Sequence, residues 1–179
     1  RMEAAMITAI VFFVQPNTMT SAYLQQARPF SLYLQRQLDN QRLNLDLMET
    51  WLNRPLNLDD FANFAPWPTL IENRDEEALS RQLRILRRHV VCQIMVRDLC
   101  RLAPLSEVTS TLFADFAVNT ALVYAENHYE HMYGKPLGGF TGNKQHLTVV
   151  GMGKMGGYEL NVSSDIDLIF VFPEAGDTN

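Results

Sequence analysis

The chain has 179 residues, of which 47% are hydrophobic and 20% charged, and its formal net charge is −5. This balance is typical of a soluble globular protein with enough apolar residues to bury a core. The negative charge argues against nucleic acid as a partner, because a phosphate backbone needs a clustered positive field on the protein. One stretch is locally basic, with Asp98 as its only acid among six arginines: Arg81, Arg84, Arg87, Arg88, Arg97 and Arg101.

The N-terminal segment, residues 1–22, contains an apolar run from Ala4 to Val14 that is interrupted only by Thr8. Eleven residues are too few to cross a bilayer as a helix. The run also lacks the basic cluster and the small-residue cleavage site of a secretory signal peptide. We therefore predict no membrane partner, and whether this segment belongs to the folded protein stays open.

Residues 23–140 are expected to form a helical region. Helices are expected from Pro29 to Leu38 and from Leu43 to Trp51, because proline suits a helix start and apolar residues recur at helical spacing. The segment 57–73 contains two prolines and is predicted to be a loop with short turns.

A long helix is expected next, from the acids at Asp75 to about Ala103, where Pro104 ends it. Its first half carries one apolar stripe, on which Arg97 and Arg101 also fall. The buried face must therefore rotate in the second half, or the helix must bend. Two interpretations of these arginines are open: they face solvent, or they reach toward an anionic site.

The same helix contains the two cysteines of the chain, Cys92 and Cys100. Eight residues apart on a helix, their α-carbons lie roughly 12 Å from each other, too far for a disulfide. Reduced thiols are the simplest interpretation and favour a cytoplasmic protein.

The next helix is expected to run from an N-cap at Ser106 to Tyr133, with Gly134 closing it. The following segment, 134–146, has four glycines and is predicted to be a linker. Apolar strands are then expected at residues 147–150 and 166–172. The predicted fold class is therefore α+β, with a helical region followed by a strand-bearing domain that starts near residue 141.

The residues between these two strands match a dinucleotide-binding pattern, since Gly151 to Gly156 fit G-x-G-x-x-G after a strand. The second strand, however, begins about nine residues after Gly156. A parallel crossover needs roughly a dozen residues or more, mostly in a helix. The spacing argues against a nicotinamide cofactor.

Metal-dependent nucleotidyl transfer fits the segment better. Asp165 and Asp167 are two apart at the start of the second strand, so both carboxylates are expected on one face, while Ile166, Leu168 and Phe170 point into the core. Adjacent carboxylates repel unless a cation lies between them, and Mg²⁺ prefers such oxygen ligands. We predict that both aspartates are catalytic and bind Mg²⁺, which can hold the attacking and leaving oxygens at phosphorus.

The glycine-rich turn is the candidate phosphate-binding element. Its glycines allow the backbone to approach phosphate oxygens closely, with N–H groups as donors. Lysine and serine side chains nearby can add charge and hydroxyl donors. The predicted nucleotide- and phosphate-binding residues are Gly151, Gly153, Lys154, Gly156, Gly157, Ser163 and Ser164.

The run GMGKMGGYELNVSSDIDLIFVFPE resembles the signature of the bacterial glutamine synthetase adenylyltransferases, which are bifunctional adenylylating and adenylyl-removing enzymes. The upstream RRHVVCQIMVRDLCRLAPLSEV is also similar to that family, more loosely. One difference is Met155, where leucine is common in the family. The resemblance implies that residues 141–179 begin a DNA polymerase β-like nucleotidyltransferase domain with a mixed sheet.

The resemblance is nearer to the family's N-terminal, adenylyl-removing domain. It implies a Mg²⁺-dependent phosphorolysis in which phosphate attacks the AMP–tyrosine bond on glutamine synthetase and releases ADP, within an enzyme that also adenylylates with ATP. It further implies regulation by a PII signalling protein in the cytoplasm. Such sites use a third carboxylate on a later strand, and Asp177 lies in a turn-like tail. We therefore expect residues 1–179 alone to be catalytically incomplete.

Two other functions remain open from the sequence. One is a regulatory or scaffolding helical domain with an inactive nucleotidyltransferase remnant. The other is a nucleotidyltransferase for a different acceptor.

Overall fold

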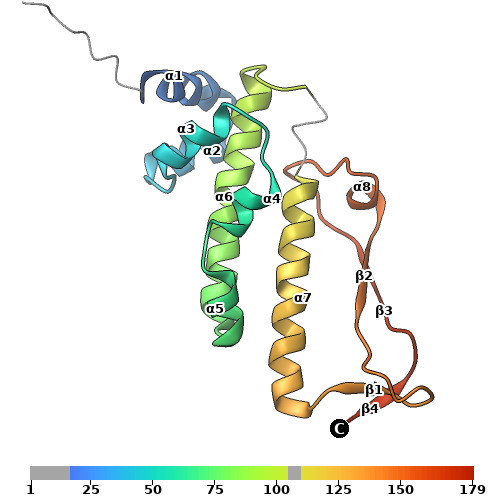
Figure 1. Ribbon diagram of the computed structural model, residues 1–179. Coiled ribbons are helices and arrows are strands. Elements are labelled where there is room, and N and C mark those ends of the chain that lie inside the picture. Colours follow the sequence, from blue (N-terminus) through green and yellow to red (C-terminus); the bar gives the residue numbers. More distant parts are fainter. Residues whose placement is uncertain (1–16, 105–109) are drawn as a thin grey trace, which may run out of the picture.

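The computed structural model describes residues 17–104 and 110–179, so the apolar run at 4–14 and the expected cap at Ser106 lie outside the described residues. The architecture is α+β, as predicted, with helices first and strands last (Figure 1). No helix in the described ranges is long and apolar enough to cross a membrane.

Seven α-helices, all but the last two short, precede the β-strands in the described ranges. They are α1 (Asn17–Ala27), α2 (Leu32–Asp39), α3 (Leu45–Leu52), α4 (Leu58–Ala62), α5 (Trp67–Glu72), α6 (Glu76–Leu99) and α7 (Thr111–Tyr133). A single 3₁₀ turn, Arg28–Phe30, joins α1 to α2 and contains the predicted helix-start proline. The predicted helices are confirmed, with ends that shift by a few residues. The cap before α7 is Ser110.

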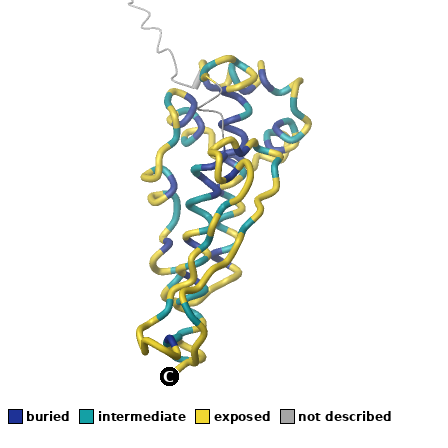
Figure 2. Tube along the Cα trace, turned by 90° about the vertical axis from the view of Figure 1, so that its right-hand side faces the viewer, coloured by how far each residue is buried: buried dark blue, intermediate teal, exposed yellow. Residues whose placement is uncertain are grey.

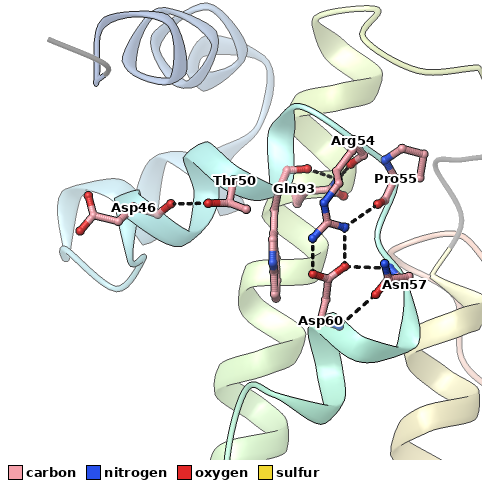
Figure 3. Close-up of polar contacts among 8 residues, drawn as sticks. Asp46, Thr50, Arg54, Pro55, Asn57, Asp60 and Gln93 are labelled. Carbon is pink, nitrogen blue, oxygen red and sulfur yellow. Dashed lines mark hydrogen bonds and ion pairs between the residues drawn. The ribbon is translucent and has the colours of Figure 1, made fainter.

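The segment 57–73 is not the predicted loop, because α4 and α5 form within it. Asn57 accepts a hydrogen bond from the backbone N–H of Asp60, whose carboxylate accepts one from the N–H of Asn57. This reciprocal cap favours a helix at α4, which the two prolines of the segment do not indicate. Arg54 extends across the same turn and forms a bidentate ion pair with Asp60, at 2.5 and 2.7 Å (Figure 3).

The second half of α6 is buried on two faces. Val90 and Ile94 belong to one hydrophobic cluster, with residues of α3, α4, α5 and α7, whereas Cys92 and Val96 belong to another, with residues of α1, α2 and α3. This arrangement explains why the apolar stripe changes direction there. Both cysteines are free thiols, as predicted, and burial raises the pKa of the Cys92 thiol to about 12.

Arg97 lies on this doubly covered part of α6 and is only 4% exposed. Its Nη1 donates to the Leu52 carbonyl oxygen at 3.0 Å, close to where Gln93 donates to the Trp51 carbonyl oxygen at 2.9 Å. The solvent-facing interpretation of Arg97 is therefore wrong, and the Leu52 partner is a neutral carbonyl rather than an anion. Arg101, beyond the end of α6, is exposed.

The helix α7 ends at Tyr133, and Gly134 follows as its C-cap with a φ of 85°, which confirms the predicted glycine closure. The next segment is not only a linker, because β1 (Pro136–Gly138) forms in it and pairs antiparallel with β4 (Gly176–Thr178). Asp177 is therefore in a strand rather than in a turn-like tail. The pair of β1 and β4 lies at the C-terminal end of α7 (Figure 1).

The predicted pair of apolar strands is confirmed as β2 (Thr148–Gly151) and β3 (Leu168–Val171). They run antiparallel alongside α7, with Gly151 opposite Leu168 and Thr148 opposite Val171 (Figure 1). The short helix α8 (Gly153–Gly156) follows β2 directly.

Burial of the second strand differs from the prediction. Leu168 is partly buried and packs against a small cluster formed by Ala114, Met155 and Leu160. Ile166 and Phe170, however, are 39% and 58% exposed. The strand pair lies alongside α7, but of these three side chains only Leu168 packs into the small cluster, and much of the strand pair is exposed (Figure 2).

Candidate active site

The glycine-rich turn and the D-x-D segment lie side by side. Gly151 closes β2 opposite Leu168, and the Met152 N–H donates to the Asp167 carbonyl oxygen at 2.9 Å. This bond continues the strand pairing by one step beyond the register of β2 and β3. The two segments that the sequence assigns to phosphate and to metal therefore share one end of the ribbon.

The local geometry of the turn favours glycine at two positions. A Cβ on Gly156 would lie 2.6 Å from the Gly151 carbonyl oxygen, a distance that real Cβ atoms do not reach. Gly153 has a φ of +54°, which favours glycine over residues with a Cβ. Both residues are exposed, as are Lys154 and Gly157, so this side of the turn is accessible to a ligand.

The turn is fixed to α7 by the small apolar cluster. Met155, on α8, is 6% exposed and packs with Leu160 and Ala114. Asp115, which follows Ala114 on α7, has a hydrogen bond with the side chain of Tyr158 just after α8. Burial raises the pKa of the Asp115 carboxyl, and this hydrogen bond lowers it. The methionine at this position, which differs from the leucine common in the resembling family, fills an apolar site.

The serines are held by a residue that the sequence did not single out. The Oδ1 of Asn161 accepts from the Ser163 N–H at 3.2 Å, the Ser163 hydroxyl at 3.1 Å and the Ser164 hydroxyl at 2.7 Å. Lys154 Nζ approaches the Ser164 hydroxyl oxygen at 3.5 Å. Asn161 thus organises the segment that leads into Asp165, and an Asn two residues before a serine is the kind of local signal that could have indicated it.

Asp165 and Asp167 are exposed and precede β3, which begins at Leu168. The prediction that they lie within the start of a strand is therefore wrong, although the backbone of Asp167 is paired. Asp165 directly follows Ser164 and lies two positions from Asp167, and exposed carboxylate oxygens are the ligands that a hard cation such as Mg²⁺ prefers, completed by water and phosphate oxygens. Within residues 17–104 and 110–179, no group of three or more His, Cys, Asp or Glu side chains could hold a metal.

A groove of about 640 Å³ runs between α6 and α7 and reaches Ser164 and Asp165. Its walls include the apolar side chains of Leu83 and Phe113. Arg84 and Arg87 also line it, so two arginines of the basic stretch lie on the groove that reaches the candidate site. The sequence had associated Arg97 and Arg101 with a possible anionic site instead.

The dinucleotide alternative is excluded by the strand direction. A dinucleotide-binding turn joins parallel strands through a full crossover helix. Here β2 and β3 are antiparallel, and only the four-residue α8 lies in a helix between them.

Comparison with known proteins identifies the family of the chain. Residues 22–179 match the family model described as glutamate-ammonia ligase adenylyltransferase. Adenylyltransferases are a class of nucleotidyltransferases. The chain belongs to the glutamate-ammonia ligase adenylyltransferase family.

Three relatives share the name bifunctional glutamine synthetase adenylyltransferase/adenylyl-removing enzyme. The one from Neisseria meningitidis serogroup A is 56% identical over 163 residues, 90% of this chain and 18% of the relative. The relative from Chromobacterium violaceum is 46% identical over 162 residues, which cover 89% of this chain and 18% of the relative. The relative from Nitrosomonas europaea is 42% identical over 156 residues, which cover 84% of this chain and 17% of the relative. The chain thus spans less than a fifth of the length of these relatives.

Proposed function

We propose that this chain carries the phosphate turn and the metal-binding aspartates of an adenylyl-removing nucleotidyltransferase domain, which removes AMP from a tyrosine of glutamine synthetase by phosphorolysis. The observation that carries the proposal is the Met152 N–H to Asp167 carbonyl bond, because it sets the glycine-rich turn directly against the D-x-D segment. The relatives' names, which include adenylyl removal, support the same assignment.

In the proposed reaction, an oxygen of inorganic phosphate attacks the phosphorus of the AMP–tyrosine phosphodiester. The bond from phosphorus to the tyrosine oxygen breaks, the tyrosine oxygen takes up a proton, and the products are ADP and unmodified tyrosine. Asp165 and Asp167 would hold Mg²⁺, which neutralises the charge on the transferring group and aligns the two oxygens. The exposed glycines and Lys154 bind phosphate oxygens. Ser163 and Ser164 are further hydroxyl donors, and each serine that donates to phosphate gives up its hydroxyl bond to Asn161 Oδ1.

The partners follow from the same proposal. The whole protein acts in the cytoplasm on glutamine synthetase, uses ATP for the reverse modification at a second domain, and responds to a PII signalling protein. No sequence or structural feature of the described residues assigns these partners a docking surface, so their support is the family membership.

The proposal is tested in a full-length family member that carries residues 22–179 of this chain. Adenylylated glutamine synthetase, phosphate and Mg²⁺ are supplied, and ADP is measured. Asp165→Asn and Asp167→Asn are each expected to lower the rate about a hundredfold or more, because a metal ion contributes several kcal/mol to such a transition state.

Asp177→Asn is the matched control, since Asp177 is exposed and lies on β4, the strand that pairs with β1, away from the turn. Its rate is expected to be unchanged. A folded protein that releases no ADP would contradict the proposal and favour a regulatory domain or another acceptor. Equal losses in all three variants would contradict the role of the D-x-D segment.

A further inference from the structure

The N-terminus of α7 makes hydrogen bonds to the loop that leads into the candidate site. Ser110, the N-cap residue, donates from its N–H to the Leu160 carbonyl oxygen at 2.7 Å. Its hydroxyl approaches two carbonyl oxygens, of Leu160 at 3.2 Å and of Asn161 at 3.1 Å. Thr111 Oγ1 accepts from the Leu160 N–H at 3.1 Å. Four contacts therefore converge on two consecutive loop residues fifty positions away in the sequence.

These contacts do not serve the helix itself. A serine at an N-cap normally accepts a hydrogen bond from a backbone N–H in the first turn of its own helix. The side chain of Ser110 makes no such bond, and its hydroxyl is directed at the loop instead. Ser110 is 7% exposed and Thr111 1%. Buried hydroxyls of this kind are costly to remove when they satisfy buried partners.

The loop at Leu160 and Asn161 is in turn hydrogen-bonded to Ser163 and Ser164. Asn161 follows Leu160, and its side chain accepts from Ser163 and Ser164. Ser164 precedes Asp165 in the chain. A continuous set of hydrogen bonds thus runs from the α7 N-terminus, through the backbone at 160 and 161, to the residue before the first aspartate.

We propose that Ser110 and Thr111 are positioning residues, which set the direction of the Asp165 carboxylate by holding Leu160 and Asn161. The inference rests on the proposed role of Asp165 in metal binding. Outer-shell hydrogen bonds that orient metal ligands contribute about 10- to 100-fold to metal affinity. Loss of the clamp formed by Ser110 and Thr111 is therefore expected to lower the metal affinity of a protein that still folds.

The test measures Mn²⁺ binding by electron paramagnetic resonance in the full-length family member carrying this chain. The relevant site is defined as the one that disappears in Asp165→Asn. Thr111→Val, which keeps the side-chain shape and removes the acceptor, is expected to weaken Mn²⁺ at that site about tenfold. Thr111→Ser, which keeps the hydroxyl, is expected to restore it. If Thr111→Val does not fold, Ser110→Ala, which removes only the hydroxyl contacts, is measured in its place.

Thr120→Val is the matched control, because Thr120 is also a buried threonine of α7 and its hydroxyl donates only within the helix, to Phe116 at 2.7 Å. It is expected to lower the melting temperature without changing Mn²⁺ affinity. Unchanged Mn²⁺ affinity in folded Thr111→Val, or an equal loss in Thr120→Val, overturns the inference.

Failure of the proposed function has a different signature. A protein that binds Mn²⁺ through Asp165 but releases no ADP contradicts the phosphorolysis, while the comparison of the threonine variants still decides the clamp. The absence of any Asp165-dependent Mn²⁺ site overturns the clamp as well.

Discussion

Arg97 and Arg101 share one stripe in the sequence and have different surroundings in the structure. Arg97 is buried, and its Nη1 donates to the Leu52 carbonyl oxygen, which links α6 to the end of α3. Arg101 lies just after α6, is exposed, and has a left-handed φ of 55°. The difference arises because α6 ends at Leu99, so Arg101 no longer follows the helical spacing that places Arg97 against α3.

Arg97→Met is therefore expected to lower the free energy of unfolding by about 1–3 kcal/mol, because the buried Leu52 carbonyl oxygen loses its donor. Arg101→Met is expected to change it by less than about 0.5 kcal/mol, as is usual for surface substitutions. Urea unfolding of both variants measures the difference. Equal stability of the two variants would show that the Arg97 contact contributes nothing specific.

At the scale of elements, α4 depends on a single carboxylate. Asp60 completes the cap with Asn57 and forms the ion pair with Arg54, and its side chain is only 8% exposed (Figure 3). The hydrogen bond from Arg54 is the main cause that lowers the pKa of Asp60, with help from the Asn57 N–H, although partial burial opposes them. A capped five-residue helix thus forms where the prolines suggest only turns.

Asp60→Asn is expected to lower the free energy of unfolding at pH 7 by about 1–3 kcal/mol, because it removes a charged hydrogen-bond partner. Since the folded-state pKa lies below the unfolded value, the wild-type advantage is present above about pH 4 and is lost as pH falls through the folded pKa. Urea unfolding at pH 7 and pH 3 measures this loss.

Asp59→Asn is the control, because Asp59 is the exposed neighbour on the same turn. It is expected to have little effect at either pH. A penalty for Asp60→Asn that is as large at pH 3 as at pH 7 would contradict the role of the charge.

At the scale of the whole molecule, stability is expected to be uneven. The helices share two large hydrophobic clusters, whereas the ribbon of β2 and β3 contacts α7 mainly through the small cluster around Met155. Isolated two-stranded ribbons are marginally stable. Exchange of the amides of β2 and β3 is therefore expected to proceed through local opening, at lower free energy than exchange in the second half of α6.

Hydrogen exchange monitored by NMR on this chain measures the two protection levels. Met155→Ala removes the contact that fixes α8 to α7, and is expected to speed exchange in the ribbon while leaving the buried half of α6 unchanged. Equal protection of ribbon and helix in the wild type would mean that the molecule opens only as one unit.

Local sequence patterns predicted most of the elements and the two halves of the candidate site. Helix periodicity located α6 and α7, and apolar runs located β2 and β3. The sequence singled out the glycine-rich turn and the aspartates because the proposed phosphate and metal binding requires those residue types at close spacing. The two short helices at 58–72 were missed, since a reciprocal cap between Asn57 and Asp60 outweighs the proline signal.

By itself, the sequence determined the α+β class, the family resemblance and the identity of the candidate metal and phosphate residues, because each depends on neighbours within a few positions. Tertiary structure alone decided that Arg97 is buried, that Phe170 is exposed, and that α7 clamps the loop at Leu160. The physical reason is that burial and hydrogen bonding depend on which surfaces meet. The meeting of Thr111 with Leu160 joins residues 49 apart, for which no local pattern carries a signal.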